Sequence, residues 1–541
     1  MSKAANIGKV STTASFHQLW GLVISTIISS IATIFIARLL GSNLYGLYGI
    51  VLIAPNLIGI FRDWGVNSAM IRYSAQCRGE GRDSEIRNIF ASGLIFEIAM
   101  GLALSALCFG LSGFLAANVF HRPTIAPLIE LASISILAIG IVNAATAAFT
   151  SLEKMENYSI MVIIQSIFKS IIMIALVVEG LGTAGAVTGY TAAYAIAGTA
   201  GVLLMYRIYR KLPKPDTRKL QIKVYIKSML RYGTPLSLAS IIGGFQSQFY
   251  AFLLPIFYVN NNAIIGNYGI ASTFVVLIAF FSTPITTMMF PAFSKLNPEK
   301  DKDALKNVFQ FSIKYASLLV VPVAMLVMCL AKTAVVTLFG SSYTSAPLFL
   351  ALLTVSYVFT SFGSLTGGPF LYSQGKTKLE LYFTLLTAAI GLPVGYVLIM
   401  HLGVLGLIIT SLTVGIPSYV IGLSWIYKHY GLAVQWRSSI KIVASSLSAA
   451  ALTYTLETTL PFSSWINLII GVVFFTIIFL VATLLIGTLD KDDIYNLRGM
   501  TSGLGPLHKI IDRILNLMEK IMAAIAIVKL ALSNKVEKKK V

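Results

Sequence analysis

The sequence predicts an all-α polytopic membrane protein with fourteen transmembrane helices and both termini in the cytoplasm. Three observations support this class. Hydrophobic residues make up 56% of the 541 residues and charged residues only 11%, whereas about 25% of the residues of a typical soluble domain are charged. Fourteen mostly apolar stretches of about 18 to 25 residues can each cross a hydrocarbon core of roughly 30 Å. Basic residues alternate with these stretches in a pattern that indicates orientation.

The distribution of lysine and arginine sets the predicted topology. If the N-terminus is cytoplasmic, 37 of the 41 Lys and Arg residues fall in cytoplasmic segments. The exceptions are Arg38, Arg122 and Lys332 in outer segments and Lys169 inside a span. Basic residues in short loops resist translocation, so a missed helix would disturb the pattern from that point onward. The net charge of +20 therefore predicts contact with anionic lipid headgroups of the cytoplasmic membrane and no nucleic-acid partner.

The predicted spans form two sets of six and a final pair. They begin at Phe16, Leu44, Asn88, Ile125, Tyr158, Ala184, Tyr232, Asn267, Ser312, Pro347, Leu381, Val404, Ser439 and Trp465. The expected domains are an N-terminal six-helix lobe (1–206), a basic cytoplasmic connector (207–231), a C-terminal six-helix lobe (232–428), an appended helix pair (429–487) and a cytoplasmic tail (488–541). The first stretch is too long for a signal peptide, so we expect it to remain as the first helix.

A weak internal repeat relates the two sets of six spans. Tyr48-Gly49-Ile50 matches Tyr268-Gly269-Ile270 at an offset of 220 residues, which aligns the second and eighth spans. Because six is an even number, both sets have the same orientation in the membrane. We therefore expect two parallel-repeat lobes around a central cavity.

The tail predicts a basic amphipathic helix over residues 507–535. Apolar residues recur there at helical spacing between Lys509, Arg513, Lys520 and Lys529. A helix lying on the cytoplasmic leaflet fits this pattern. The alternative is a helix packed on the protein's own loops.

Transport is predicted in preference to catalysis, because titratable residues are scattered. The sequence has no His-Glu-x-x-His motif, no Asp-rich cluster and no Gly-rich phosphate loop followed by Lys. Its three cysteines have no disulfide or metal-ligand spacing. We expect no catalytic residue, metal or cofactor, and the sequence leaves open whether Na⁺ or H⁺ is a coupling ion. A membrane-embedded glycan enzyme is an alternative.

Charges inside spans are the best indicators of a substrate path, because an unpaired charge in hydrocarbon is costly. Lys169 lies 11 residues into its span, roughly 17 Å deep and near the bilayer midplane. Glu97 enters the third span from the same side. Lys169 either binds an anionic substrate in a cavity or pairs with Glu97, and both arrangements satisfy its charge.

Gln246 and Gln248 in the seventh span are further candidates for the cavity. Their amides can donate to and accept from sugar hydroxyls. Interhelical hydrogen bonding is the equally ordinary alternative.

Several motifs resemble those of polysaccharide transporters, the Wzx-type oligosaccharide-lipid flippases of the multidrug/oligosaccharidyl-lipid/polysaccharide (MOP) exporter superfamily. The motifs are ARLLGSNLYGLY at 37–48, GVNSAMIRYSA at 65–75, LFGSSY at 338–343 and GKTK at 375–378. The similarity covers nearly all the spans and excludes the tail.

The resemblance implies alternating-access transport of polyprenyl- or dolichyl-linked oligosaccharides to the outer leaflet, for surface polysaccharide or protein glycosylation. Glycan-assembly enzymes are then expected partners. A diphosphate needs cationic partners, so the resemblance adds Arg38 and Arg72 to Lys169 as binding candidates. Arg38 and Arg72 also fit a role as snorkelling anchors near opposite membrane faces.

Two departures separate the chain from related branches. The lipid II flippase branch carries an arginine inside its first span, whereas residues 16–36 here hold no charge. Drug/cation antiporters typically use an acid in the first or seventh span, and neither span has one here. The oligosaccharide-lipid branch is therefore favoured, and a small-molecule or cation antiporter using Glu97 is the alternative.

Overall fold

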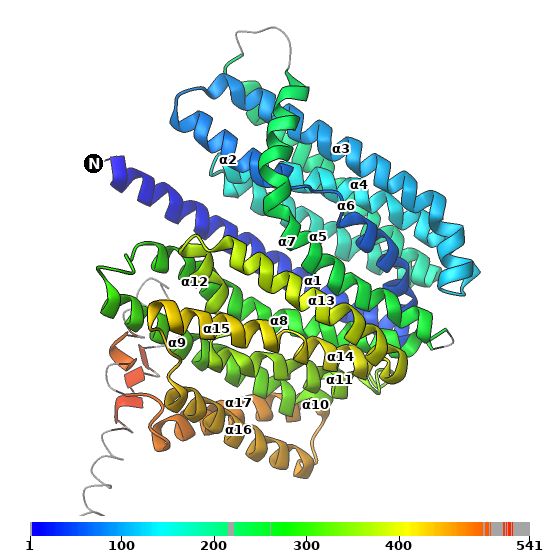
Figure 1. The fold of residues 1–541 in the computed structure, drawn as a ribbon. Helices are drawn as coiled ribbons and strands as arrows, with labels where there is room; N and C mark the ends of the chain where they lie inside the picture. The colour runs from blue at the N-terminus through cyan, green and yellow to red at the C-terminus, as the bar shows by residue number, and fades with distance from the viewer. Residues whose placement is uncertain are drawn as a thin grey trace, which may run out of the picture. The chain divides into compact units, whose positions relative to one another are not determined.

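The computed structural model describes residues 3–214, 221–259 and 261–490, together with 493–496, 498, 512–513, 515–516, 518–520 and 522 of the tail. Every regular element in these ranges is a helix, as Figure 1 shows. The predicted all-α class is therefore confirmed for the described residues.

The first half of the chain consists of helices joined by short turns. Its elements are α1 (Lys3–Gly59), α2 (Val66–Gly79), α3 (Asp83–Phe114), η1 (Leu115–Val119), η2 (Pro123–Ile125), α4 (Ala126–Ser151), α5 (Met155–Leu176), η3 (Val177–Leu181) and α6 (Gly182–Lys211). Gly41, with φ of 67°, interrupts α1 between the first two predicted spans. Gly180 (φ 90°) and Gly182 (φ 51°) also take positive φ, which glycine adopts without the Cβ clash of other residues. They turn the chain from α5 into α6.

The second half continues with more interrupted helices. Its elements are α7 (Ile222–Phe257), α8 (Asn262–Ser294), α9 (Lys302–Cys329), α10 (Ala331–Phe339), α11 (Ala346–Thr354), η4 (Val355–Phe362), α12 (Gly367–Ser373), α13 (Thr377–Leu402), α14 (Val404–Thr413), α15 (Ile416–Tyr430), α16 (Trp436–Thr459) and α17 (Ser464–Leu485). The tenth predicted span corresponds to a pair of helical segments, Ala346–Phe362 and Gly367–Ser373, bent by 50°.

Within the described residues, ten helical stretches are long and apolar enough to cross a membrane, or eleven if the bent pair is one span. The protein is therefore a multi-pass membrane protein. Trp20–Gly59 (40 residues) and Met155–Lys211 (57 residues) each contain two of the predicted spans, since about 20 residues suffice to cross the hydrocarbon core. The number fourteen and the cytoplasmic position of both termini stay predictions.

The chain divides into two compact units. Unit 1 comprises Met1–Ile270, Leu338–Ala346 and Glu380–Ser418, and unit 2 comprises Ala271–Thr337, Pro347–Leu379 and Tyr419–Val541. Unit 1 therefore holds α1 to α7, the start of α8, most of α13 and all of α14. The lobe, connector and tail boundaries expected from the sequence stay predictions.

Unit 1 packs around α4, which contacts α1, α2, α3 and α6. This helix is rich in small buried residues, including Gly140, Ala144 and Ala148, and small residues let helices approach closely inside a membrane. Bulky apolar residues such as Phe109 of α3 and Ile171 of α5 remain exposed. Such residues are typical of a lipid-facing surface, because lipid tails are as apolar as the side chains.

The described tail residues pack against unit 2. Leu515 and Met518 lie in a buried cluster with Leu484, Leu489 and Ile494. Nearby, Lys314 of α9 donates a 2.5 Å hydrogen bond to buried Asp493. These contacts favour packing on the protein itself for this part of the tail. Most of the amphipathic helix predicted over 507–535 lies outside the described residues, so its membrane contact stays a prediction.

Candidate functional site

A fully buried carboxylate marks the interior of unit 1. Glu97 of α3 is 0% exposed, and Arg62, in the turn after α1, is 7% exposed. Arg62 Nε lies 3.1 Å from Glu97 Oε2, and Asn67 Nδ2 of α2 donates to Glu97 Oε1 at 2.6 Å. Arg62 Nη1 also donates to the Ile136 carbonyl at 3.3 Å. A buried charge needs such a partner and further hydrogen bonds to offset its desolvation.

A glycine on α4 makes room for this pair. A Cβ at Gly140 would lie 2.8 Å from Arg62 Cδ and 2.9 Å from Glu97 Oε2. Both distances are shorter than ordinary van der Waals contact, so the pair fits here because position 140 lacks a side chain.

Lys169 lies over an aromatic ring and not beside Glu97. Its ammonium is 5.8 Å from the centroid of the Tyr190 ring on α6, within the range of a cation–π interaction. In the part of the chain that the structure describes, Lys169 makes no ion pair with a carboxylate. In the structure, the partners of Glu97 are Arg62 and Asn67, and the two roles considered for Lys169 stay predictions.

Tyr190 belongs to a group of four tyrosines, Tyr45, Tyr48, Tyr190 and Tyr194, which we call the tyrosine cluster. The Tyr190 and Tyr194 ring centroids are 4.9 Å apart, those of Tyr48 and Tyr190 6.5 Å and those of Tyr45 and Tyr48 5.9 Å. The Lys169 ammonium therefore lies beside a group of four aromatic rings that carry hydroxyls.

The two glutamines of α7 differ in their surroundings. Gln246 Nε2 donates to the Tyr250 hydroxyl at 2.7 Å and to the Thr387 carbonyl of α13 at 3.4 Å. The space for these contacts comes from Gly391, where a Cβ would lie 2.2 Å from Gln246 Nε2. Gln246 thus takes part in the interhelical bonding that was the alternative to sugar contact. Gln248 is partly exposed, and residues two apart on a helix face different directions.

Arg38 and Arg72 are both exposed and bind elsewhere in unit 1. Arg38 Nε donates to the Leu338 carbonyl at 2.7 Å. The Arg72 guanidinium lies 4.2 Å from the centroid of the Tyr232 ring of α7. These contacts fit an anchoring role for both arginines.

α7 is attached to the first half of the chain at two places. At Gly233, inside the helix, a Cβ on Gly65 would lie 2.2 Å from the Gly233 carbonyl oxygen, so the two backbones touch. At the C-terminal end of the helix, buried Arg122 donates to the carbonyls of Pro255 at 3.0 Å and Tyr258 at 2.6 Å, and to Asn262 Oδ1 at 2.8 Å. α7 therefore closes unit 1 at two places along its length.

The sequence analysis missed Arg62, Arg122 and the tyrosine cluster. Charge counting placed Arg62 in a cytoplasmic loop and Arg122 in an outer one. A usable signal was the spacing of the tyrosines, because positions 45 and 48, and 190 and 194, are three and four residues apart and share a helix face. The described residues contain no group of three His, Cys, Asp or Glu that could hold a metal ion.

Two family models match the helical part of the chain, and neither extends into the tail after residue 487. A family model described as "Polysaccharide biosynthesis protein" matches residues 35–348, more than half of the chain. The chain belongs to the polysaccharide biosynthesis protein family. A second model, described as "Lipid II flippase MurJ", matches residues 271–480. The resemblance to flippases of the MOP superfamily is thereby confirmed at the level of the family.

Individual relatives of this member of the polysaccharide biosynthesis protein family are distant. The probable low-salt glycan biosynthesis flippase Agl15 of Haloferax volcanii is 22% identical over 279 residues, which cover 52% of this chain and 57% of that relative's length. The lipid II flippase MurJ in an inward closed conformation superposes with a TM-score of 0.66 at 14% identity, covering 88% of this chain and 98% of that one. An inward-facing MATE transporter of the MOP superfamily gives 0.57 at 19% identity, covering 75% and 95%. These similarities establish the fold.

Proposed function

We propose that the protein moves diphosphate-linked oligosaccharides on a polyprenyl or dolichyl carrier from the cytoplasmic to the outer leaflet of the cytoplasmic membrane. It acts as a transporter and not as an enzyme. Both termini are cytoplasmic in this proposal, and fourteen spans form two parallel lobes and an appended pair. Membership of the polysaccharide biosynthesis protein family supports the substrate class, as does the similarity to a glycan flippase of Haloferax volcanii.

The observation that carries the proposal is the position of the Lys169 ammonium, 5.8 Å from the centroid of the Tyr190 ring. A diphosphate spreads its negative charge over several oxygens, which cationic donors bind through charge-assisted hydrogen bonds. Tyrosine rings beside this cation offer apolar faces for the sugar rings and hydroxyls for their polar edges. The tyrosine cluster with Lys169 therefore combines the cation and the aromatic faces that a diphosphate-sugar headgroup would contact.

Alternating access in this proposal releases one of the two α7 contacts at a time. Opening the Gly65–Gly233 contact exposes the site to one side, and opening the Arg122 contacts exposes it to the other. Pro235 and Pro255 lie inside α7 close to these two contacts. Each proline removes a backbone hydrogen bond and permits bending there.

Glu97 argues against the antiporter alternative. A coupling cation would have to compete with the Arg62 guanidinium, which already neutralises this carboxylate at 3.1 Å. Uptake of a fluorescent cation by proteoliposomes would favour the antiporter, and turnover of a glycolipid by the purified protein would favour a glycan enzyme.

The decisive experiment is reconstituted flipping of a fluorescent lipid-linked oligosaccharide, measured by its accessibility on the outside of proteoliposomes. Lys169→Ala is expected to slow flipping by about tenfold to a hundredfold, the effect of losing one hydrogen bond to a charged group. Lys169→Arg should retain part of the activity because the cation remains.

Lys306→Ala is the matched control, because Lys306 is an exposed lysine of α9. It should flip at the wild-type rate. Unchanged flipping by well-folded Lys169→Ala would show that the diphosphate binds elsewhere.

A further inference from the structure

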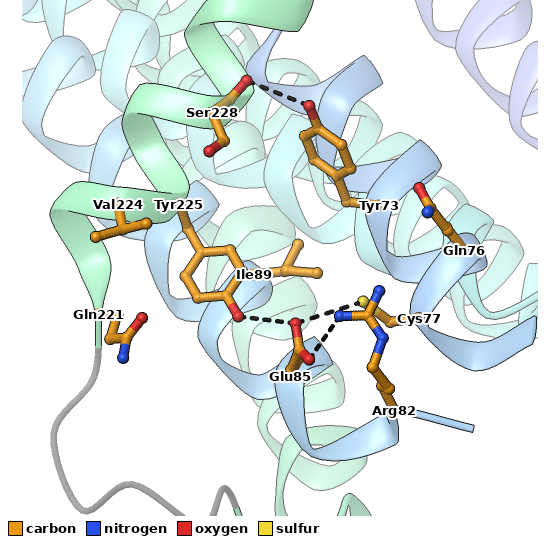
Figure 2. A pocket seen from close by; sticks show the side chains of 10 residues that line it. All are labelled: Tyr73, Gln76, Cys77, Arg82, Glu85, Ile89, Gln221, Val224, Tyr225 and Ser228. Atoms are coloured by element: carbon orange, nitrogen blue, oxygen red, sulfur yellow. Dashed lines mark hydrogen bonds and ion pairs between the residues drawn. The ribbon is translucent and has the colours of Figure 1, made fainter. Parts of the chain in front are cut away.

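A cavity of about 330 Å³ lies in unit 1, away from the tyrosine cluster. Figure 2 shows it between α2, the first turns of α3 and the first turns of α7. Its lining residues are Tyr73, Gln76, Cys77, Arg82, Glu85, Ile89, Gln221, Val224, Tyr225 and Ser228. Its volume is at the lower end of the roughly 300 to 1,000 Å³ of small-molecule sites, which suits one sugar unit.

The lining combines aromatic rings with neutral polar groups. Tyr73 and Tyr225 lie on α2 and α7, and Gln76 and Gln221 contribute amides (Figure 2). The Gln76 amide nitrogen also donates to Glu80 Oε1 at 2.9 Å, which leaves its oxygen as an acceptor. The Tyr225 hydroxyl donates to Glu85 Oε2 at 3.0 Å and the Tyr73 hydroxyl to the Ser228 carbonyl at 3.4 Å. Apolar ring faces beside amide donors and acceptors match the two faces and the hydroxyl edge of a pyranose.

The charges of the cavity are balanced internally. Arg82 Nη1 donates to Glu85 Oε1 at 2.6 Å, and its Nε donates to Glu80 Oε2 at 2.9 Å. The guanidinium therefore already has two carboxylate partners, so the cavity lacks an uncommitted cation among its lining residues. This charge balance favours a neutral polar ligand over a phosphate.

We propose that this cavity binds a neutral sugar unit of the lipid-linked glycan before its headgroup reaches the tyrosine cluster. The inference rests on the proposed function and adds a loading site to it. Helix α2 carries Tyr73 and Cys77 at the cavity, and its Asn67 donates to Glu97. The cavity lies between α2, α3 and α7, and α7 is the helix whose two contacts close unit 1.

The rate at which the Cys77 thiol is labelled measures whether a ligand occupies this cavity. Its thiol lines the cavity and is 4% exposed, and burial raises its pKa, so labelling is slow and best measured at mildly alkaline pH. Replacing Cys108 and Cys329 by alanine leaves it as the only thiol, since the chain has three cysteines. The rate of its reaction with a small charged methanethiosulfonate reports how often the cavity is open.

The probe is the free oligosaccharide released by mild acid from the cells' own lipid-linked pool. It should slow labelling of Cys77 in the purified full-length protein, whereas inorganic diphosphate should not. Tyr225→Ala should raise the oligosaccharide concentration for half-protection by about tenfold, as expected from losing an aromatic contact. Tyr225→Phe, which keeps the ring, and Tyr206→Ala, at an exposed tyrosine of α6, should protect like the parent.

If Tyr225→Ala fails to fold, Gln76→Ala tests the same cavity from the surface of α2. Absence of protection by the oligosaccharide, or protection by diphosphate instead, overturns the loading site. Protection of Cys77 by the oligosaccharide without reconstituted flipping supports the sugar site but overturns the proposed function. Reconstituted flipping without protection of Cys77 supports the proposed function but overturns the sugar site.

Discussion

Arg62 and Glu97 show how a single ion pair can be central to this protein and still escape a sequence analysis. The sequence identified Glu97 and Lys169 as embedded charges, and both lie in the helices expected for them. It left open whether Lys169 binds an anionic substrate or pairs with Glu97, because both arrangements satisfy the charge. The true partner of Glu97 depends on the space left by Gly140, which is a property of packing between helices that no single segment encodes.

Because the Arg62–Glu97 pair is buried, we expect removal of one charge to destabilise the protein much more than removal of both. Arg62→Ala leaves the Glu97 carboxylate buried without its cation, and we expect a loss of about 3 to 5 kcal/mol in the free energy of unfolding. The double change Arg62→Met with Glu97→Leu removes both charges and should recover most of it. Thermal unfolding in detergent measures both effects.

Flipping assays distinguish the contribution of the Arg62–Glu97 pair to stability from a contribution to transport. The double variant should be abundant and should flip at close to the parent's rate, because Lys169, the cation proposed to bind the diphosphate, is unchanged. Arg82→Ala is the control for stability, since Arg82 and Glu80 are both 46% exposed and exposed pairs contribute about 0 to 1 kcal/mol. Slow flipping by an abundant double variant would show that the Arg62–Glu97 pair takes part in transport.

At the scale of elements, helix lengths were predictable, but only some of the helix interruptions were. Hydropathy located the apolar segments, because each must cover a fixed thickness of lipid. It placed a break between the spans that begin at Phe16 and Leu44, where Gly41 has a non-helical backbone, but it gave no indication that the segment from 66 to 79 forms a helix of its own. Such details depend on local backbone geometry and on neighbouring helices.

The crossing of α1 and α8 depends on two glycines facing each other. A Cβ at Gly46 would lie 1.9 Å from the Asn262 carbonyl oxygen, and one at Gly266 would lie 2.0 Å from the Ser42 carbonyl oxygen. Gly46→Ala must therefore push two backbones apart, and we expect a loss of about 1 to 3 kcal/mol in stability. The measurement is the melting temperature in detergent.

Gly49→Ala is the matched control on the same helix. No atom lies within 4 Å of the Cβ that it adds, and alanine is favoured over glycine in a helix by about 1 kcal/mol. We expect this variant to be as stable as the parent or more so. Equal losses for both substitutions would mean that helix propensity or lipid contact, and not the crossing, determines the result.

At the scale of the whole molecule, the distribution of Lys and Arg between loops predicts which side of the membrane each loop faces. This topology depends on the number of spans, because each span moves the following loop to the other side. Each lobe must contain an even number of spans for the two halves to be parallel repeats. The described structure identifies ten or eleven stretches by length and composition, and long stretches that contain two predicted spans account for part of the difference from fourteen. The internal repeat was visible in a few matched residues only. Two halves with the same orientation in the membrane must both have apolar spans, but they need not have the same residues at matching positions.

Helix α8, Asn262–Ser294, is the strictest test of this parity, because it corresponds to the eighth predicted span. Reporter fusions after Asn261 and after Asp301 should report the outer side and the cytoplasm respectively, since positive charge follows α8 at Lys295 and Lys300. A fusion after Thr459, at the end of α16, should also report the outer side and controls for reporter function. If both sites flanking α8 report the same side, α8 does not cross the membrane. The second half would then have an odd number of spans before its appended pair, and a parallel pair of lobes could not form.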